Sequence, residues 1–171
     1  VAASAKLFSW LLPLHDAARL ATGFYMALTF LFCGLAGREL NGERHGVVAA
    51  LLLLGCFGLV VRSHQLINDA ASLAGYAIAY YGFALAVRRP LPGGFWIGTG
   101  MGLVFMTQGL PETAIVVLTA AALPLFTAWR NRGYATGLAI ALAAAAPWLG
   151  IWPALLYAQS PELFNQWLWN E

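Results

Sequence analysis

Charged side chains are scarce in this sequence: only 9% of its 171 residues are Asp, Glu, Lys or Arg, against about 25% in an ordinary soluble domain. Hydrophobic residues make up 61% of the chain. A soluble domain of this size would still leave roughly 30% of its unfolded surface in water. The composition therefore excludes a soluble globular domain, and it also excludes a disordered chain. It predicts an integral membrane protein.

Clusters of positive charge and paired cysteines are also missing. The nine Lys and Arg residues are scattered and nearly balanced by seven Asp and Glu residues, which argues against a nucleic-acid partner. The two cysteines, Cys33 and Cys56, fall inside apolar runs, so neither a disulfide framework nor a CxxC metal site is predicted. The chain begins with neither Met nor a signal peptide, and we expect it to be part of a longer protein.

Long apolar runs are abundant, and a membrane helix needs about 20 such residues. Four runs meet or approach this length. A fifth is interrupted at residues 107–112, where Pro111 and Glu112 forbid one continuous span. The expected fold is therefore all-α, a polytopic bundle of about six membrane helices of which two are short. The predicted helices are Ala17–Gly37, Gly46–Val61, Ala70–Val87, Phe95–Met106, Thr113–Ala128 and Ala135–Ala158.

Both ends of the chain are predicted to lie along the membrane surface. Lys6–Leu14 is too short to span, and Pro161–Trp169 places Leu, Phe and Trp residues at helical spacing opposite polar ones, as interfacial helices do. Such segments are also typical of simple aromatic anchors. The predicted organisation is one transmembrane domain over residues 1–171, with interfacial segments at 1–16 and 159–171 around the membrane helices at 17–158.

Positive charges are divided unequally between the predicted loops. The loops at residues 38–45, 88–94 and 129–133 hold six of the nine Lys and Arg residues. The two termini and the loops at 62–69 and 107–112 form the other set, which holds five of the seven acids. By the positive-inside rule, the first three loops are cytoplasmic and the second set faces an outer compartment. We expect the membrane to be a bacterial inner membrane, with the second set in the periplasm.

Most of the unusual polar residues lie in this second set. Asp69 precedes the helix predicted from Ala70, where a carboxylate can simply cap the helix or can bind a metal or a sugar hydroxyl. Arg19, at the start of the first span, can pair with Asp16 on one helical face or bind an anionic headgroup. The break at 107–112 is either an ordinary turn or a non-helical segment whose N–H groups hold a phosphate.

Two further patterns have plain structural explanations. Gly98 and Gly102 form a GxxxG motif, which predicts close helix packing; no strand precedes it, so it is not a dinucleotide-binding fingerprint. His64 lies five residues before Asp69, a spacing that is not specific for metal binding. Ser63 and His64 are adjacent and do not face each other on a helix, so they are not a catalytic pair.

Several motifs follow one another along the chain. In order, they are Ala17-Ala18-Arg19-Leu20, Asn68-Asp69-Ala70, Gly100-Met101-Gly102-Leu103, Met106-Thr107-Gln108-Gly109, Pro147-Trp148 and Pro161-Glu162-Leu163-Phe164. This order resembles the membrane region of GT-C glycosyltransferases, which use polyprenyl-phosphate sugars as donors. The chain is similar to lipid A aminoarabinose transferases and to bacterial protein O-mannosyltransferase-like proteins, and the resemblance covers most of its length.

The resemblance implies an inverting transfer of a sugar from a polyprenyl-phosphate donor to a lipid or protein acceptor on the periplasmic face. Acceptor activation needs a base, and Asp69 matches the family's second acidic position. Arg19, Arg62, His64 and Gln108 lie on the predicted outer side and become candidates for binding the donor phosphate. Gln108 stands where relatives commonly carry Lys, so it offers an ordinary hydrogen bond in place of a charge.

The resemblance leaves the cofactor unknown, with a divalent metal as one alternative, and the other expected partners are membrane lipids. The family's first catalytic acid would lie upstream of this chain, so the chain by itself is expected to be inactive. Two other classes stay open. In a transporter or flippase fragment, residues 107–112 would form a discontinuous helix, although such breaks usually occur in pairs. A non-catalytic membrane assembly protein is slightly favoured by Gln108.

Overall fold

The computed structural model describes residues 14–56 and 69–160, and every regular element within these ranges is helical. Three of the described helices, α2, α6 and α7, contain stretches long and apolar enough to cross a membrane. The predicted all-α membrane helix bundle is therefore confirmed. The elements in chain order are α2 (Leu14–Asn41), α3 (Glu43–Leu54), α5 (Asp69–Ala86), α6 (Pro90–Ala122), the 3₁₀ helix η1 (Leu123–Leu125) and α7 (Arg132–Gln159).

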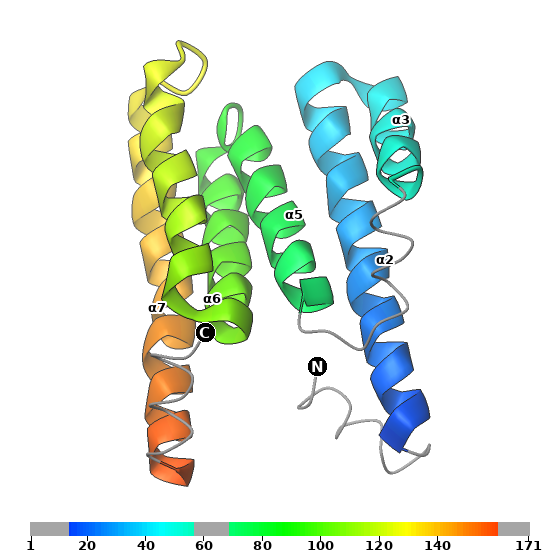
Figure 1. Cartoon of the computed structure of the whole chain (residues 1–171). Helices are drawn as coiled ribbons and strands as arrows, with labels where there is room; N and C mark the ends of the chain where they lie inside the picture. Colours follow the sequence, from blue (N-terminus) through cyan, green and yellow to red (C-terminus); the bar gives the residue numbers. More distant parts are fainter. Residues whose placement is uncertain (1–13, 57–68, 161–171) are drawn as a thin grey trace.

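Helix α6 consists of two segments that run in opposite directions (Figure 1). The direction changes at Gly109, whose φ of 72° and ψ of −152° lie outside the helical region. Residues 90–108 form the first segment and residues 110–122 the second. The sequence predicted two short helices separated at 107–112, and this prediction is confirmed.

Contacts with α5 establish the same reversal independently. A Cβ added to Gly93 would lie 2.6 Å from the Cα of Ala86, and one added to Gly75 would lie 2.8 Å from a Val104 methyl group. The later residues of α5 therefore meet the earlier residues of the first segment, so these two run antiparallel. Tyr76 of α5 instead contacts residue 112 and Phe83 contacts residue 129. The second segment therefore continues in the same direction as α5.

The first segment of α6 packs against α7 through glycine. A Cβ on Gly94 would lie 2.1 Å from the carbonyl oxygen of Gly137, and one on Gly98 would lie 2.3 Å from another carbonyl oxygen of α7. A Cβ on Gly102 would lie 2.4 Å from Trp148. Since these three glycines are four residues apart, they share one helical face. The close contact predicted from the GxxxG motif is confirmed.

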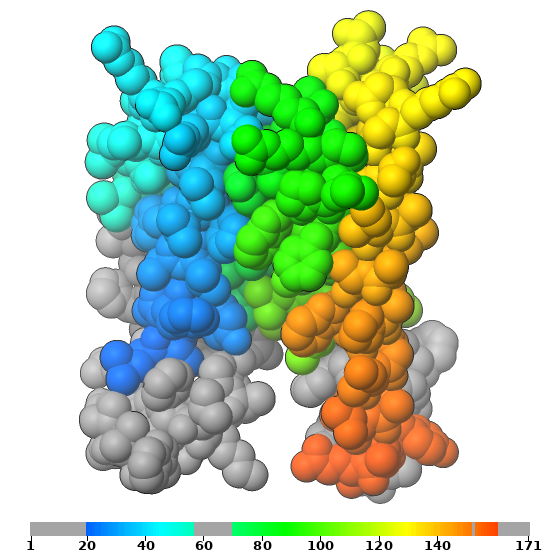
Figure 2. All heavy atoms as spheres, turned by 180° about the vertical axis from the view of Figure 1, so that it is seen from behind, coloured from blue at the N-terminus to red at the C-terminus, as the bar shows by residue number. Residues whose placement is uncertain are grey.

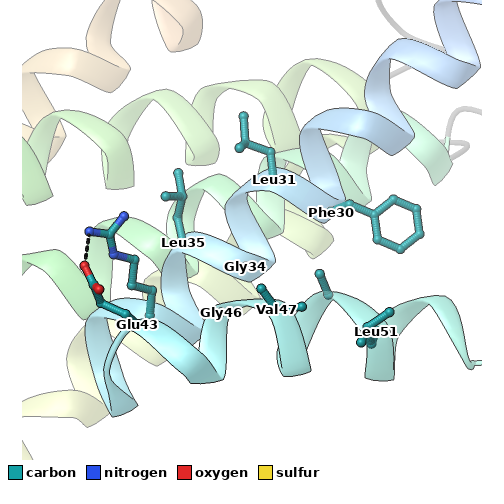
Figure 3. Close-up of a pocket in the computed structure, with 10 residues that line it drawn as sticks. Phe30, Leu31, Gly34, Leu35, Glu43, Gly46, Val47 and Leu51 are labelled. Atoms are coloured by element: carbon teal, nitrogen blue, oxygen red, sulfur yellow. Dashed lines mark hydrogen bonds and ion pairs between the residues drawn. The ribbon is translucent and has the colours of Figure 1, made fainter.

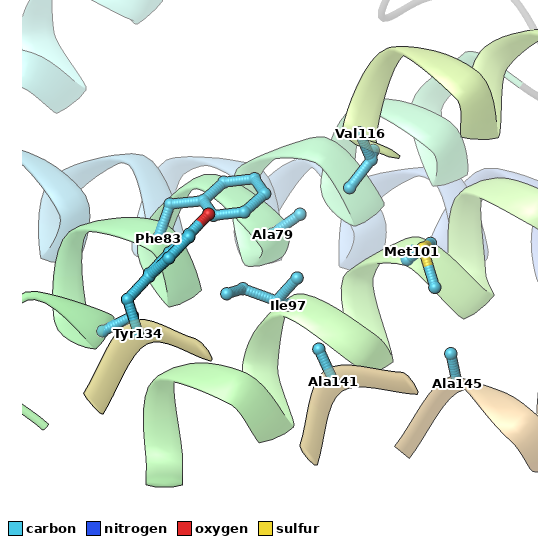
Figure 4. Close-up of a cluster of buried hydrophobic side chains, with 9 residues drawn as sticks. Ala79, Phe83, Ile97, Met101, Val116, Tyr134, Ala141 and Ala145 are labelled. Carbon is cyan, nitrogen blue, oxygen red and sulfur yellow. The ribbon is translucent and has the colours of Figure 1, made fainter. Parts of the chain in front are cut away.

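The buried core lies where α5, both segments of α6 and α7 meet (Figure 4). Val116 from the second segment and Ile97 from the first belong to the same cluster, so both segments are anchored to one core. The buried members of this cluster are Ala79, Phe83, Ala86, Ile97, Met101, Val116, Tyr134, Ala141 and Ala145.

Aromatic side chains join α2 to this core. The Phe32 ring lies 5.6 Å from the Tyr81 ring and 5.1 Å from the Trp96 ring, measured between centroids. The Tyr81 and Trp96 rings are 6.1 Å apart. These are favourable separations for aromatic pairs, and the three residues come from α2, α5 and α6. Helices α2 and α5 each run without a break from this contact back to their first residues. The contact therefore also fixes where the two helices begin relative to each other.

Helix α3 differs from the span predicted over Gly46–Val61. It begins earlier, at Glu43, and it ends at Leu54 after 12 residues; residues 57–61 lie outside the described ranges. It begins early because Gly42, with a φ of 96°, reverses the chain immediately after α2. A hydrophobicity pattern marks the apolar part of a helix, whereas polar residues can extend that helix beyond the apolar part.

The helix predicted over Thr113–Ala128 is too long. The second segment of α6 ends at Ala122 and is followed by η1, and Phe126 is extended with a ψ of 136°. Pro124 explains the early end, because proline lacks an N–H group and clashes with the preceding helical turn.

The loops gather at the two ends that the charge pattern predicted. The end of α2 and the connections 87–89 and 123–131 lie together at the upper end in Figure 1. We call this the basic end, since the six arginines of the predicted cytoplasmic loops belong to it. The starts of α2 and α5, the α6 reversal and the end of α7 lie at the opposite end, which we call the site end. The predicted interfacial residues 6–13 and 161–169 lie outside the described ranges.

The contact of α6 with α7 predicts that replacing glycine by alanine has opposite effects on stability at Gly98 and at Gly150. Gly98→Ala should destabilise the folded protein by about 1–3 kcal/mol, as overpacking typically does, because its Cβ would meet the α7 backbone. Gly150→Ala should be neutral or stabilising by up to about 1 kcal/mol, because alanine favours helix and a Cβ there meets no atom within 4 Å. Unfolding of both variants in detergent, followed by circular dichroism, checks this. Equal effects would contradict the close contact.

Candidate functional site

The site end brings together three of the five predicted site residues. Arg19 lies within α2, close to its start, and Asp69 is the first residue of α5. Gln108 is the last residue before the α6 reversal. Figure 1 places the start of α2, the start of α5 and the reversal at one end of the bundle. The other two predicted residues, Arg62 and His64, lie outside the described residues.

The reversal itself is built around glycine and two threonines. The φ and ψ of Gly109 fall in a region that is almost restricted to glycine, and the residue is buried. Thr113 Oγ1 donates a hydrogen bond to the Gly109 carbonyl oxygen at 2.7 Å, and Thr107 Oγ1 donates to that of Leu103 at 2.9 Å. Pro111 lies in the first turn of the second segment, where a helix leaves N–H groups unbonded anyway. The turn is therefore a well-defined structure.

A tyrosine on α5 holds this turn. The Tyr76 hydroxyl lies 3.0 Å from the main-chain carbonyl oxygen of Glu112 and also contacts the Glu112 carboxylate. Both side chains are partly buried. The sequence marks Glu112 only as a helix breaker and an outer acid, and no motif in it includes Tyr76. The spacing of seven residues between Asp69 and Tyr76, which places the two on one face of a helix, could have identified Tyr76 as a residue near the site.

The turn is accessible enough to meet a ligand. Gln108 and Glu112 are half-buried, while Leu110 is 57% exposed. The Gln108 amide can donate hydrogen bonds to phosphate oxygens, and a carboxylate can accept them from sugar hydroxyl groups. Among the residues that the structure describes, no group of three or more His, Cys, Asp or Glu side chains is placed to hold a metal ion.

An apolar hollow of about 290 Å³ adjoins the turn. Met106, two residues before Gln108, forms one wall, and the second half of α7 forms the other. Figure 2 shows green atoms of α6 and yellow-to-orange atoms of α7 side by side on the face opposite to that of Figure 1. The residues that line the hollow are Met106, Pro147, Trp148, Ile151 and Leu155.

A second hollow, of about 420 Å³, lies between α2 and α3 (Figure 3). The two helices touch there through glycine, since a Cβ on Gly46 would lie 2.7 Å from the carbonyl oxygen of Gly34. Arg38 and Glu43 line the hollow and form an ion pair at 2.8 Å that is largely exposed. Because this pair belongs to the basic end, the second hollow is separate from the site end.

Comparison with known families now assigns the chain. Residues 2–152 match the family described as dolichyl-phosphate-mannose-protein mannosyltransferase. The chain belongs to this family. It is thus a membrane glycosyltransferase of the mannosyltransferase type, and the resemblance found in the sequence is confirmed. The family favours the enzyme over the transporter and assembly-protein alternatives. No curated protein and no solved structure matches the chain.

The reversal predicts a sharp effect at Gly109. Gly109→Ala should cost about 1–3 kcal/mol of strain, because a residue with a Cβ is held in a region that glycine alone populates readily. Gly23→Ala is the matched control, since no atom lies within 4 Å of a Cβ at that position. The fraction of monodisperse protein that survives a heating series in detergent measures the difference. Survival of Gly109→Ala equal to that of Gly23→Ala would contradict the turn geometry.

Proposed function

We propose that this protein transfers a sugar from a polyprenyl-phosphate donor to a lipid or protein acceptor, and that the reaction takes place at the site end, on the periplasmic face of a bacterial inner membrane. The observation that carries the proposal is that the start of α2 with Arg19, the start of α5 with Asp69 and the α6 reversal with Gln108 are at one end of the bundle, opposite the six arginines. The family supports the transfer of a sugar. The distribution of positive charge supports the outer placement.

Asp69 is the proposed catalytic base. Transfer requires that a hydroxyl group of the acceptor lose its proton as it attacks the sugar carbon, and a carboxylate at hydrogen-bond distance can take that proton. Asp69 is the first residue of α5, at the site end of the bundle. By the positive-inside rule this end faces the outer compartment, from which the acceptor would approach.

The donor phosphate is proposed to bind Arg19, Arg62, His64 and Gln108. The arginines supply fixed positive charge and planar hydrogen-bond donors that suit phosphate. Gln108 contributes a neutral hydrogen bond beside the first turn of the second α6 segment, where the helix dipole also favours negative charge. The phosphate would therefore be held by α2, by Arg62 and His64, and by the α6 turn.

The lipid part of the donor needs an apolar surface next to the phosphate. The hollow lined by Met106, Trp148 and Leu155 meets this need, because its walls are apolar and it adjoins the turn that carries Gln108. A polyprenyl chain lying there could remain in contact with the bilayer while its phosphate reaches the membrane boundary. The donor class is thus supported by an apolar hollow whose wall at Met106 lies two residues before Gln108.

Removal of the proposed base should abolish most of the transfer. In the full-length protein, Asp69→Asn should lower the transfer rate by about 100-fold or more, the usual contribution of a general base, while expression is retained. Glu39→Gln is the matched control, because it removes a carboxylate near the basic end of α2. Transfer from radiolabelled dolichyl phosphate mannose to acceptors in host membranes is the measurement. Unchanged transfer in Asp69→Asn would reduce this residue to a helix cap.

Membrane sidedness can be tested without any activity assay. In a background without Cys33 and Cys56, a cysteine at Leu110 should react with a membrane-impermeant thiol reagent added from outside, because this exposed residue lies in the turn. A cysteine at Arg130 should react only after the membrane is opened. The opposite pattern would place the turn in the cytoplasm and exclude a periplasmic reaction.

A further inference from the structure

Helix α5 carries both the proposed base and the contact that holds the α6 turn. Asp69 and Tyr76 are seven positions apart, about two helical turns, so they occupy the same face of the helix. The Tyr76 hydroxyl lies 3.0 Å from the Glu112 carbonyl oxygen and contacts the Glu112 carboxylate. Gln108 lies four residues before Glu112, at the other end of the turn. One helix is therefore linked directly to both parts of the proposed site.

The Tyr76 ring is itself held in place. It stacks on the Tyr80 ring at 6.2 Å with an interplanar angle of 18°, and Tyr80 contacts Phe83 at 6.3 Å between centroids. The Phe83 carbonyl oxygen accepts a hydrogen bond from Trp129 Nε1 at 3.0 Å. These contacts follow α5 from the turn to Trp129, in the connection between η1 and α7. The Tyr76 hydroxyl therefore meets Glu112 from a fixed position.

The turn reverses at a glycine, and glycine has more backbone freedom than any other residue type. A glycine at position 109 therefore does not by itself hold the φ and ψ values that set the direction of the second segment. The bond from Thr113 to the Gly109 carbonyl oxygen is local to the turn. The Tyr76–Glu112 contact joins residues 36 positions apart, and it ties the turn to another helix.

We infer that Tyr76 is a positioning residue: through Glu112 it fixes the turn at residues 107–112 against α5, and so sets the position of Gln108 relative to Asp69. The inference rests on the proposed function, in which Gln108 binds the donor phosphate. Its physical basis is that a reacting group displaced by about 1 Å can lose as much as a hundredfold in rate. Tyr76 does not touch the donor.

The kinetic test removes one oxygen atom. Tyr76→Phe in the full-length protein should raise KM for dolichyl phosphate mannose about tenfold, the usual effect of losing a hydrogen bond to a charged group, with a smaller change in kcat. Tyr80→Phe is the matched control, because this neighbouring tyrosine stacks on Tyr76 and is 44% exposed. Glu112→Gln should raise KM by less than Tyr76→Phe does, since its side-chain oxygen still accepts the tyrosine proton but carries no charge. A merely structural role would lower the amount of active protein and leave KM unchanged.

A second measurement follows the turn without activity. Thr113 is only 7% exposed, so a cysteine at this position should react slowly with an impermeant maleimide in a background without Cys33 and Cys56. Tyr76→Phe should accelerate this reaction about tenfold, because local opening costs less free energy once the contact is lost. Tyr80→Phe should leave the rate unchanged.

The two proposals fail in different ways. Unchanged labelling in Tyr76→Phe, or a loss of transfer without a change in KM, would overturn the positioning role and leave the proposed function standing. A normal transfer rate in Asp69→Asn would overturn the proposed function even if the labelling changed. If Tyr76→Phe does not accumulate in the membrane, Glu112→Ala removes the carboxylate contact but keeps the bond from Tyr76 to the main-chain carbonyl oxygen. It should accelerate labelling at Thr113→Cys by less than Tyr76→Phe is expected to, and labelling at the wild-type rate would show that the carboxylate has no part in holding the turn.

Discussion

The backbone of the first α6 segment touches a helix on each side, and the arrangement of the site end depends on this double contact. Lipid gives two helices no hydrophobic reason to associate, so close van der Waals packing has to hold them. Gly94, Gly98 and Gly102 supply it toward α7, while Gly93 and Gly100 supply it toward α5. Because these contacts leave no room for a Cβ on α6, the level at which α6 reverses is set relative to both neighbours. The turn therefore lies at the same end as the start of α5.

A non-helical turn near a membrane boundary has to satisfy its backbone groups within the protein. The turn at 107–112 does so in three ways that depend on residue type. Gly109 adopts a conformation closed to other residues, Pro111 has no N–H group to satisfy, and Thr113 donates to the Gly109 carbonyl oxygen. The same turn leaves Gln108 and Glu112 half-buried. A stable turn and an accessible polar surface are thus compatible here because the local bonds and the contact of Glu112 with Tyr76 hold the turn.

Much of the fold could be predicted from apolar runs and charge, and the errors have local causes. The break at residues 107–112 was predictable because Pro111 and Glu112 interrupt an apolar run, and the two ends of the bundle were predictable because the arginines lie in alternate loops. The start of α3 could not be predicted in this way, because the positive φ of Gly42 lets a new helix begin one residue after α2 ends. The early end of the second α6 segment depends on Pro124, whose effect hydrophobicity alone does not show.

By itself, the sequence determined the membrane location, the all-α fold and the break in the fifth apolar run, because each depends on composition or on residues close together in the chain. The glycosyltransferase class was implied by the resemblance of motifs spread along most of the chain. The sequence also pointed to Asp69 and Gln108 as polar residues beside predicted helix ends. Only the tertiary structure decided that Tyr76 contacts Glu112. These residues are 36 positions apart, and they meet because glycine contacts bring α5 and α6 together. No local periodicity records a contact of that kind, since two packed helices are needed to create it.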